Sequence, residues 1–339
     1  MPAAVEPSAS TVDLSVVVPI YNEEESLLEM HRRLSEVLAG LGVTHELLLV
    51  NDGSRDRSAE LIGDLVSQDP AVRGIHFSRN FGHQAALAAG LQHCSGRAVI
   101  VIDADLQDPP ELIGAMLERW RDGYEVVYAQ RVARRRESLL KRATAYAFYR
   151  ILRRITPVEI PSDTGDFCLM DRRIVDLLNA MPERNRYVRG LRAWVGFRQT
   201  SVTFERAPRF AGEPKYTFAK SVGLAINGIL SLSKLPLRLA TYFGLLVSAA
   251  SFILAIWFVI QRLSGQPLIR GWSSTVVIVL FLGGVQLLTI GIIGEYLSRI
   301  YDEVKGRPLY VVQSRDGFAA HSLRDPVPAA RPVAGVAGR

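Results

Sequence analysis

The first half of the chain alternates short apolar runs with longer stretches in which apolar residues recur at helical spacing. The runs predict buried strands, and the stretches between them predict helices of about ten to fifteen residues. We expect strands at Leu14–Pro19, Glu46–Val50, Val72–Phe77, Ala98–Ile102 and Val126–Ala129. We expect helices from an Asn22 cap to Gly40, from Asp56 or Ser58 to Gln68, and from Gly82 to Cys94. This alternation predicts an α/β domain with a mainly parallel sheet covered on both faces.

The second half contains two runs without any charge, Leu239–Ile260 and Thr275–Gly294. As a helix, each run is about 30 Å long, which is the thickness of a bilayer's hydrocarbon core. Both are apolar on all sides and end in aromatic and basic residues, which favours membrane spans over buried core helices. The pattern predicts a two-helix transmembrane hairpin, although a pair of core helices would satisfy the same hydropathy.

An amphipathic stretch precedes the first uncharged run. Its apolar face is formed by Phe218, Val222, Ala225, Ile226, Ile229 and Leu232. This predicts an interfacial helix lying on the membrane, with a core-facing helix as the alternative. The chain therefore divides into a flexible N-terminus (1–13), a main domain (14–217), a juxtamembrane helix (218–238), two spans (239–261 and 273–297), a C-terminal segment (298–317) and a disordered tail (318–339).

The charge distribution orients this arrangement. The chain carries a net charge of +6, and its basic residues gather just outside the two uncharged runs, while the loop between them carries only Arg262 and Arg270. The positive-inside bias predicts that the main domain and the tail are cytoplasmic, and residues 1–13 carry no signal-peptide pattern. Anionic lipids and phosphate-bearing substrates explain this charge better than nucleic acid does. We expect Cys94 and Cys168 to be reduced in that compartment.

Acidic residues follow the fourth expected strand, in the sequence Asp103-Ala104-Asp105-Leu106-Gln107. Asp103 and Asp105 are two residues apart, so their side chains point the same way on an extended segment, and the bend that follows can bring Gln107 to the same side. Hard oxygen ligands of this kind predict Mg²⁺ or Mn²⁺, which bridge to substrate phosphates. An acidic turn without a ligand is the alternative.

Three further loops follow expected strands: 19–23, 51–54 and 79–84. In parallel α/β sheets, ligands bind beyond the carboxyl ends of the strands. We therefore expect these loops and residues 103–107 to meet at one crevice.

The motifs at 17–23 (Val-Val-Pro-Ile-Tyr-Asn-Glu), 51–54 (Asn-Asp-Gly-Ser), 78–84 (Ser-Arg-Asn-Phe-Gly-His-Gln) and 103–111 resemble those of the inverting family 2 glycosyltransferases. Within that family the chain resembles the polyprenyl-phosphate type, which includes bactoprenol glucosyltransferases and dolichyl-phosphate mannose synthases. The similarity continues at 163–167, 212–216 and 294–297 and covers roughly residues 14–312. It implies a Rossmann-like nucleotide-sugar-binding domain of the GT-A type.

The resemblance also implies roles for individual residues. The nucleotide base and ribose would be held by Pro19, Tyr21, Glu23 and Asp52. The metal, and through it the diphosphate of the nucleotide sugar, would be held by Asp103, Asp105 and Gln107. The lipid phosphate would be received by Arg131, Arg142 and Lys215, although Lys215 would serve equally well as a headgroup anchor. Asp166, with Asp105 and Arg131, would be catalytic. The departure is Asn51, where many relatives carry a second Asp.

The chemistry of the acceptor limits what Asp166 needs to do. A phosphate monoester has its second pKa near 6, so it is largely dianionic at neutral pH and needs no general base. Asp166 would then orient a substrate or stabilise positive charge at the anomeric carbon. The sequence leaves base and positioning roles open.

The implied reaction is inverting transfer of one sugar, with glucose from UDP-glucose first, to undecaprenyl phosphate for modification of cell-envelope glycans such as the O-antigen of lipopolysaccharide. Other donors remain open: UDP-N-acetylhexosamine, a UDP-aminopentose and GDP-mannose. The resemblance also implies a bacterial inner-membrane protein and a homo-oligomer, with a tetramer suggested. A processive polysaccharide synthase is disfavoured because residues 189–194 do not fit its Gln-x-x-Arg-Trp motif. The alternative from another class is a non-catalytic membrane scaffold or nucleotide-sugar sensor.

Overall fold

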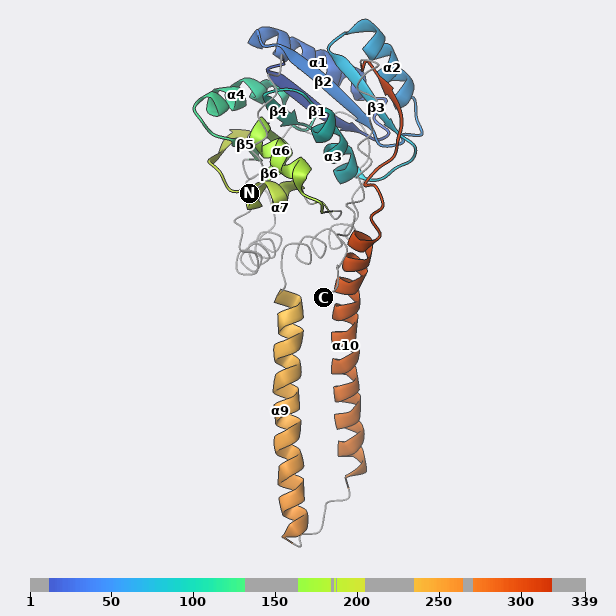
Figure 1. Ribbon diagram of the computed structural model, residues 1–339, viewed down its shortest axis with the longest axis vertical. Coiled ribbons are helices and arrows are strands. Elements are labelled where there is room, and N and C mark those ends of the chain that lie inside the picture. Colours follow the sequence, from blue (N-terminus) through green and yellow to red (C-terminus); the bar gives the residue numbers. More distant parts are fainter. Residues whose placement is uncertain are drawn as a thin grey trace, which may run out of the picture. The chain divides into compact units, whose positions relative to one another are not determined.

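The computed structural model describes residues 12–131, 164–183, 186, 188–204, 235–264 and 271–318. Its main unit contains a sheet with the strand order β7-β5-β6-β4-β1-β2-β3-β8 (Figure 1). The strands are β1 Leu14–Ile20, β2 His45–Asn51, β3 Val72–Phe77, β4 Ala98–Val101, β5 Val126–Arg131, β6 Thr164–Asp171, β7 Gln199–Phe204 and β8 Val312–Asp316. The helices of this unit are α1 Leu27–Leu41, α2 Ser58–Gln68, α3 His83–His93, α4 Ile113–Arg121, α6 Arg172–Ala180 and α7 Val188–Trp194, with a 3₁₀ turn at Pro110–Leu112.

The prediction of a mainly parallel sheet is confirmed. Strands β1, β2, β3 and β4 pair in parallel, and so do β5 and β7. The exceptions are β6, which is antiparallel to β4 and β5, and β8, which is antiparallel to β3. The sequence pattern did not predict β6, β7 or β8.

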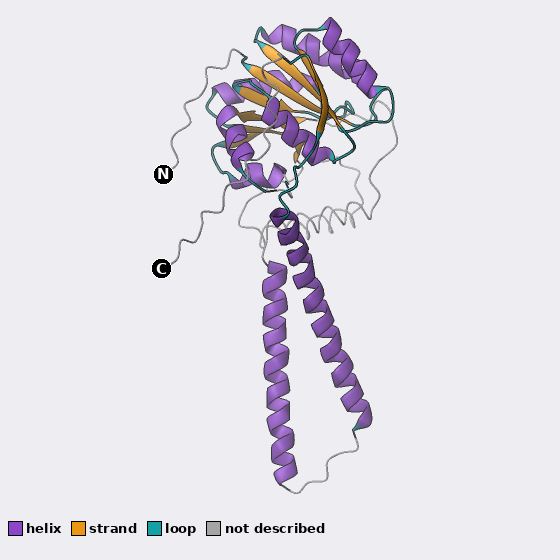
Figure 2. Ribbon diagram, turned by 45° about the vertical axis from the view of Figure 1, so that its right-hand side comes forward, coloured by secondary structure: helices purple, strands orange, loops and turns teal. Residues whose placement is uncertain are grey.

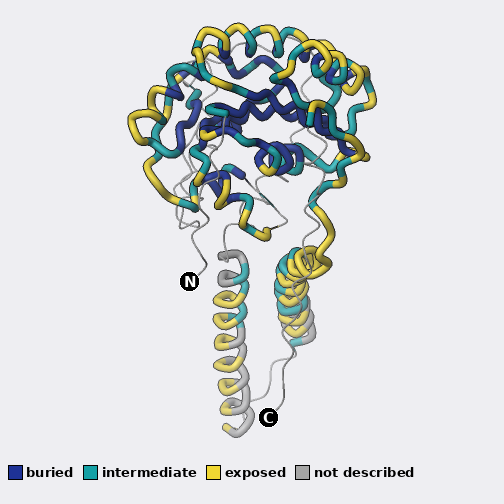
Figure 3. Tube along the Cα trace, turned by 45° about the horizontal axis from the view of Figure 1, so that its top comes forward, coloured by how far each residue is buried: buried dark blue, intermediate teal, exposed yellow. Residues whose placement is uncertain are grey.

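The sheet separates two apolar cores, because successive side chains of a strand point to opposite faces. In β1, Val16 and Val18 pack into the core under α1, α2 and α4. Val17 packs into the other core, under α3, α6 and α7. Figure 2 shows the sheet between its helices, and Figure 3 shows that its strands form the buried centre.

The first expected helix begins later than its sequence suggested. Asn22 does not cap it, because its φ of 52° lies in the left-handed region, and α1 begins at Leu27. The intervening backbone bonds across to the next loop instead: Glu23 N donates to Ser58 Oγ (3.0 Å) and Glu24 N donates to Asp56 Oδ2 (3.1 Å). The turn at residues 22–26 therefore joins two loops rather than starting a helix.

The second unit contains α9 Leu235–Leu263 and α10 Trp272–Val304, which cover the two uncharged runs. Many of their apolar side chains are exposed, among them Leu245, Phe252 and Leu287. Within the described residues one stretch, Phe281–Val304, is long and apolar enough to cross a membrane, and it is not buried. The predicted juxtamembrane helix lies outside the described residues up to position 234, as does the predicted tail from 319 onward.

Candidate functional site

Hydrogen bonds join the loops at the carboxyl edge of the sheet. Asn22 N donates to Ser54 Oγ (3.0 Å), and Arg55 N donates to Asn22 Oδ1 (2.8 Å). The carboxylate of Asp52 accepts from Phe81 N (2.6 Å) and Gly82 N (2.9 Å). The loops after β1, β2 and β3 therefore meet, as their positions after parallel strands predicted.

The four residues predicted to hold the nucleotide differ in accessibility. Pro19 is buried within β1, whereas Tyr21 and Glu23 are half-buried at its end. Asp52 is only 2% exposed, and this burial raises the pKa of its carboxyl despite the two backbone donors. Its carboxylate thus ties the loop after β2 to the loop after β3, while Tyr21 and Glu23 offer accessible surface.

The acidic segment after β4 alternates between buried and accessible residues. Asp103, Asp105 and Gln107 are half-buried, whereas Ala104 and Leu106 are buried. Gln107 N donates to Asp105 Oδ1 (3.2 Å), and Leu106 adopts a left-handed φ of 58°. That conformation costs a leucine about 1–2 kcal/mol, which the burial of its side chain offsets. The accessible positions are the three that the sequence predicted to be metal ligands.

Asp103 has the environment of a cation ligand. Its side chain is 32% exposed, but Oδ1 is buried and has no hydrogen-bond partner among the described residues. Burial, together with the negative charges of Asp166, Asp108 and Asp105, outweighs the opposing charge of His83 and raises the pKa of Asp103 to about 6. An unsatisfied buried carboxylate oxygen is costly, and a divalent cation would remove that cost.

The donor set fits a cation that is shared with substrate. In the described part of the chain, no group of three His, Cys, Asp or Glu residues could hold a metal alone. Mg²⁺ is commonly bound through one or two carboxylates, with substrate phosphates and water completing its coordination. Asp103 and Asp105, with Gln107 beside them, meet that requirement.

The Asp166 carboxylate accepts hydrogen bonds from an arginine and a histidine. Its side chain is 6% exposed and accepts from Arg189 Nε (2.7 Å), Arg189 Nη2 (3.0 Å) and His83 Nε2 (3.1 Å). Burial alone would raise the pKa of Asp166, but the hydrogen bonds from His83 and Arg189 outweigh it and hold the pKa well below its ordinary value. Asp166 is therefore a permanent anion at neutral pH and a poor proton acceptor.

His83 connects the two acidic positions. Its Nε2 lies 3.1 Å from Asp166 Oδ2 and 3.7 Å from Asp103 Oδ1. Burial lowers the pKa of His83, but the hydrogen bond to Asp166 and the charge of Asp103 outweigh it, so the net shift is upward. The candidate metal site and the buried Asp166 thus belong to one cluster of charged groups.

Arg131 lies at the end of β5, close to the same cluster. Its Nη2 is 3.4 Å from Oδ1 of the buried Asp108, and a Cβ on Gly165 would approach Nη2 to 3.2 Å. Its Nε is buried without a hydrogen-bond partner among the described residues. A guanidinium with an unused donor can bind a phosphate oxygen. The other predicted phosphate ligands, Arg142 and Lys215, lie outside the described residues.

The sequence pattern missed three residues of this site. His83 lies within the motif at 78–84, which assigns it no individual role, and Arg189 and Arg192 lie in the stretch that does not fit the synthase motif. Arg192 is 1% exposed and donates to the backbone carbonyls of Gly165 (3.2 Å) and Asp166 (3.4 Å), which fixes the start of β6. Only the pairing of β6 beside β4 brings these residues together, and that pairing has no local signal in the sequence.

Known proteins resemble the chain over most of its length. Residues 15–178 match the family model described as glycosyl transferase family 2, and residues 235–300 match the one described as GtrB C-terminal hairpin. An uncharacterized glycosyltransferase of Bacillus subtilis, YkcC, is 50% identical over 91% of this chain and 95% of its own length. The SfII prophage-derived bactoprenol glucosyl transferase of Shigella flexneri is 44% identical over 88% of this chain and 97% of its own length.

One solved structure illustrates a more distant similarity. Glucosyl-3-phosphoglycerate synthase from Mycobacterium tuberculosis, in complex with Mn²⁺ and UDP-glucose, aligns with a TM-score of 0.42 at 19% identity. The alignment covers 65% of this chain and 78% of that chain.

Proposed function

Given that this chain belongs to glycosyl transferase family 2, we propose that it transfers a single glucosyl group from UDP-glucose to the phosphate of a polyprenyl phosphate. The similarity to bactoprenol glucosyl transferases over nearly the whole chain supports this choice of donor and acceptor. The proposal depends most on two buried polar atoms of the site that have no hydrogen-bond partner among the described residues. One is Oδ1 of Asp103, and the other is Nε of Arg131. The first suits a cation, and the second suits a phosphate.

The donor would bind along the edge formed by the loops after β1, β2 and β4. Tyr21 and Glu23, backed by Pro19 and Asp52, would contact the base and ribose. Asp103 and Asp105, assisted by Gln107, would hold Mg²⁺ or Mn²⁺. The bound cation would supply neutralising charge to the diphosphate as it leaves.

The acceptor phosphate would bind to Arg131, together with Arg142 and Lys215. A phosphate oxygen forms the new bond to the anomeric carbon while the bond from that carbon to UDP breaks, and the electron pair leaves with UDP. No proton has to move, because the monoester is already dianionic. Most of the acceleration would come from alignment of the two substrates and from electrostatic stabilisation of the leaving group.

Asp166 would act as a positioning anion in this reaction. Its low pKa fits a carboxylate that never takes up a proton during turnover. By accepting from both Arg189 and His83, it would hold these two cationic groups beside the reacting phosphates.

We further propose that the hairpin formed by α9 and α10 spans the bacterial inner membrane twice, with the main domain in the cytoplasm. The exposed apolar side chains of both helices and the basic residues outside the uncharged runs support this topology. It would hold the site at the depth of a lipid phosphate and raise the effective concentration of that acceptor. A homo-oligomer, with a tetramer as the expected size, is the proposed assembly.

A donor panel tests the function. The purified full-length protein, in nanodiscs with undecaprenyl phosphate, is given UDP-glucose, UDP-N-acetylglucosamine, a UDP-aminopentose or GDP-mannose, with Mg²⁺, Mn²⁺ or EDTA. We expect one glucosyl group per lipid from UDP-glucose, and none with EDTA. Absence of a lipid-linked sugar from every donor would refute the proposal, and a polymeric product would favour a processive synthase.

A further inference from the structure

The strand that follows the hairpin in the sequence returns to the main unit and joins its sheet. β8 pairs with the edge strand β3, so that Gly74 faces Asp316 and His76 faces Ser314. Tyr310, just before β8, stacks on Phe77 with ring centroids 4.8 Å apart. Protection of the exposed edge of β3 would by itself explain this pairing. However, β8 also makes polar contacts that reach the loop after β2.

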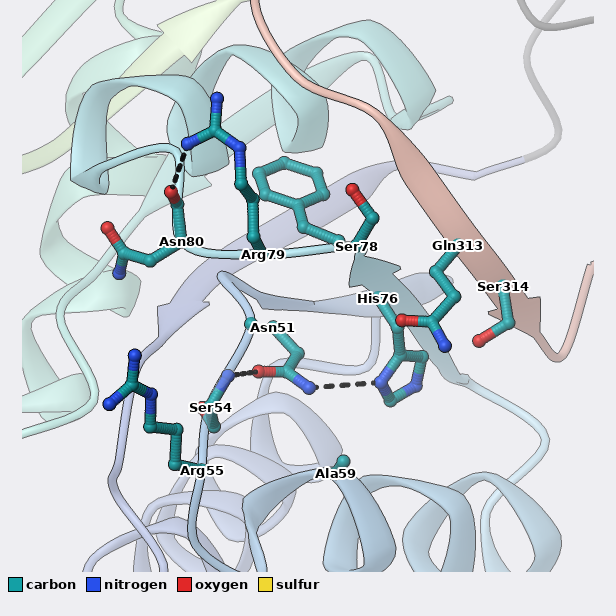
Figure 4. Close-up of a pocket in the computed structure, with 12 residues that line it drawn as sticks. Asn51, Ser54, Arg55, Ala59, His76, Ser78, Arg79, Asn80, Gln313 and Ser314 are labelled. Carbon is teal, nitrogen blue, oxygen red and sulfur yellow. Dashed lines mark hydrogen bonds between the residues drawn. The ribbon is translucent and has the colours of Figure 1, made fainter.

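A line of hydrogen bonds runs from β8 into the loop after β2. Asp316 Oδ2 lies 3.0 Å from His76 Nε2, and His76 Nδ1 lies 3.1 Å from Asn51 Nδ2. Asn51 Oδ1 accepts from Ser54 N (2.9 Å). Figure 4 shows Asn51 between His76 and Ser54, with both hydrogen bonds drawn.

The hydrogen bond from Ser54 N to Asn51 fixes which atoms donate and which accept along the rest of this line. Asn51 uses its oxygen for Ser54 N, so its amide nitrogen faces His76. His76 Nδ1 is then the acceptor, and its Nε2–H donates to Asp316. Removal of the Asp316 carboxylate would leave His76 without the partner that fixes its tautomer and ring orientation.

The line ends at residues that we propose to bind the donor. Ser54 Oγ accepts from Asn22 N (3.0 Å), and Asn22 lies between Tyr21 and Glu23. Four side chains therefore connect the C-terminal strand to the turn that would hold the base and ribose: Asp316, His76, Asn51 and Ser54. His76 and Asn51 are 8% and 4% exposed, so solvent cannot readily replace the contact between them, whereas the side chain of Asp316 is 40% exposed at the outer end of the line.

The surrounding backbone makes room for this arrangement. A Cβ on Gly74 would lie 2.8 Å from Ile62 Cγ2, 3.1 Å from His76 Nε2 and 3.5 Å from Asp316 Cβ, so glycine leaves space both for Ile62 and for the His76–Asp316 pair. The register of β8 shifts opposite His76 and Phe77, which makes Gln313 an extra residue in the strand. Gln313 and Ser314 line a cavity of about 420 Å³ together with Asn51, His76 and Arg55 (Figure 4).

We propose that Asp316 and His76 are positioning residues for the donor nucleotide, through which the strand after the hairpin sets the conformation of the nucleotide-binding turns. This inference rests on the proposed function, because it takes the turns at residues 19–23 and 51–54 as the base and ribose site. The substrate class concerned is the nucleoside diphosphate portion of the donor. The acceptor lipid would bind elsewhere, at the cluster that contains Arg131.

The test uses full-length protein and two readouts: steady-state kinetics with UDP-glucose, and UDP binding measured by calorimetry in the presence of Mg²⁺. For Asp316→Ala we expect the UDP-glucose KM and the UDP Kd to rise about three- to tenfold, with kcat within about twofold of wild type. Asp316→Asn keeps an acceptor for His76 Nε2–H and should restore both values to within about twofold. His76→Gln keeps a donor towards Asp316 but is not expected to reach Asn51, so it should reproduce the Asp316→Ala result.

A matched control exists in the same unit. His31 and Asp69 form another His–Asp pair, with Nε2 and Oδ2 3.1 Å apart, between α1 and the residue after α2. Asp69 precedes β3, so this pair belongs to the opposite, amino-terminal edge of the sheet. Asp69→Ala should leave the UDP Kd and the donor KM unchanged, whatever it does to the melting temperature.

The possible outcomes separate the inference from the proposed function. If the wild-type protein makes no glucosyl lipid, the proposed function is refuted. The role of β8 is still tested in that case, because the UDP Kd values of wild type and variants can be compared without turnover. Unchanged Kd and KM in both Asp316→Ala and His76→Gln would overturn the inference, as would an equal change in Asp69→Ala. A loss confined to kcat would overturn it too, because positioning of the donor must act on donor affinity.

Discussion

Asp103 and Asp166 are two carboxylates of the same site, on neighbouring strands, in opposite electrostatic situations. Asp103 follows β4 and Asp166 lies in β6, where Val101 faces Cys168. Asp103 has a buried oxygen without a hydrogen-bond partner among the described residues and a pKa raised to about 6. Asp166 accepts hydrogen bonds from Arg189 and His83 and has a pKa held well below its ordinary value.

The difference shows how environment assigns separate roles to identical side chains. Asp103 Oδ1 lies 3.7 Å from His83 Nε2 but accepts no hydrogen bond from a described residue, and a divalent cation that arrives with the donor would supply that missing partner. Asp166 already has its positive charge from Arg189 and His83, so it has neither need of a metal nor capacity for a proton.

The largest effect is expected at the metal position. Asp105→Asn should lower kcat/KM for UDP-glucose by about 10³-fold or more, because a neutral amide cannot replace a carboxylate ligand of Mg²⁺ or Mn²⁺. The rate of lipid-linked glucose formation measures it. Asp122→Asn, a change to an exposed acid after α4, is the control and should leave the rate unchanged. Retention of a tenth of wild-type activity in Asp105→Asn would remove Asp105 from the metal site.

The next effect concerns the partner of Asp166. Arg189→Ala should lower kcat about 10²-fold, because it removes both guanidinium hydrogen bonds from a buried carboxylate. The variant should also lose about 2 kcal/mol of unfolding free energy at pH 7, because a buried acceptor loses its donors.

The pH dependence of that loss has a definite sign. The folded pKa of Asp166 is depressed, so its stabilisation is present above the unfolded pKa near 4 and is lost as the pH falls below that value. Melting temperatures of wild type and Arg189→Ala should therefore converge at acid pH. Arg33→Ala, which breaks the exposed Arg33–Glu111 pair, is the control and should keep wild-type kcat. Melting curves that stay equally far apart at low pH would contradict the assignment.

These two regions also differ in how far the sequence could predict them. Asp103, Asp105 and Gln107 lie within five residues, so strand geometry and the following bend were enough to group them. Strands β1 to β5 were predictable because their buried runs are apolar. Strand β8 was not, because Gln313, Ser314 and Arg315 give an edge strand no apolar pattern. The cluster of His83, Asp166 and Arg189 depends on the register of β6, which is fixed by tertiary packing rather than by local sequence.

A smaller effect is expected at the phosphate-binding arginine. Arg131→Lys keeps the charge but loses the forked donors, so the KM for polyprenyl phosphate should rise about tenfold. The KM for UDP-glucose should stay within about twofold, because the donor diphosphate would be neutralised mainly by the cation held at Asp103 and Asp105. Kinetics with each substrate varied in turn would test this. A rise confined to the UDP-glucose KM would move Arg131 from the acceptor to the donor side.

The smallest effect is the pH dependence of metal binding. A pKa of about 6 means that protons compete with the cation for Asp103 as the pH falls. The Mn²⁺ affinity of the protein with UDP should drop about fourfold between pH 8 and pH 5.5, in proportion to the ionised fraction of that carboxyl. Titrations followed by electron paramagnetic resonance measure it. An affinity that does not change over this range would show that Asp103 is not the ligand that titrates.

The contrast between the two carboxylates is tested most directly by Mn²⁺ binding to the Asp103→Asn and Asp166→Asn proteins in the presence of UDP. We predict that both variants lose turnover, but that only Asp103→Asn loses Mn²⁺, with an affinity at least tenfold below wild type. Asp166→Asn should bind Mn²⁺ within about threefold of wild type, because its carboxylate is already neutralised by Arg189 and His83. Equal loss of Mn²⁺ in the two variants, or normal binding in Asp103→Asn, would contradict this account.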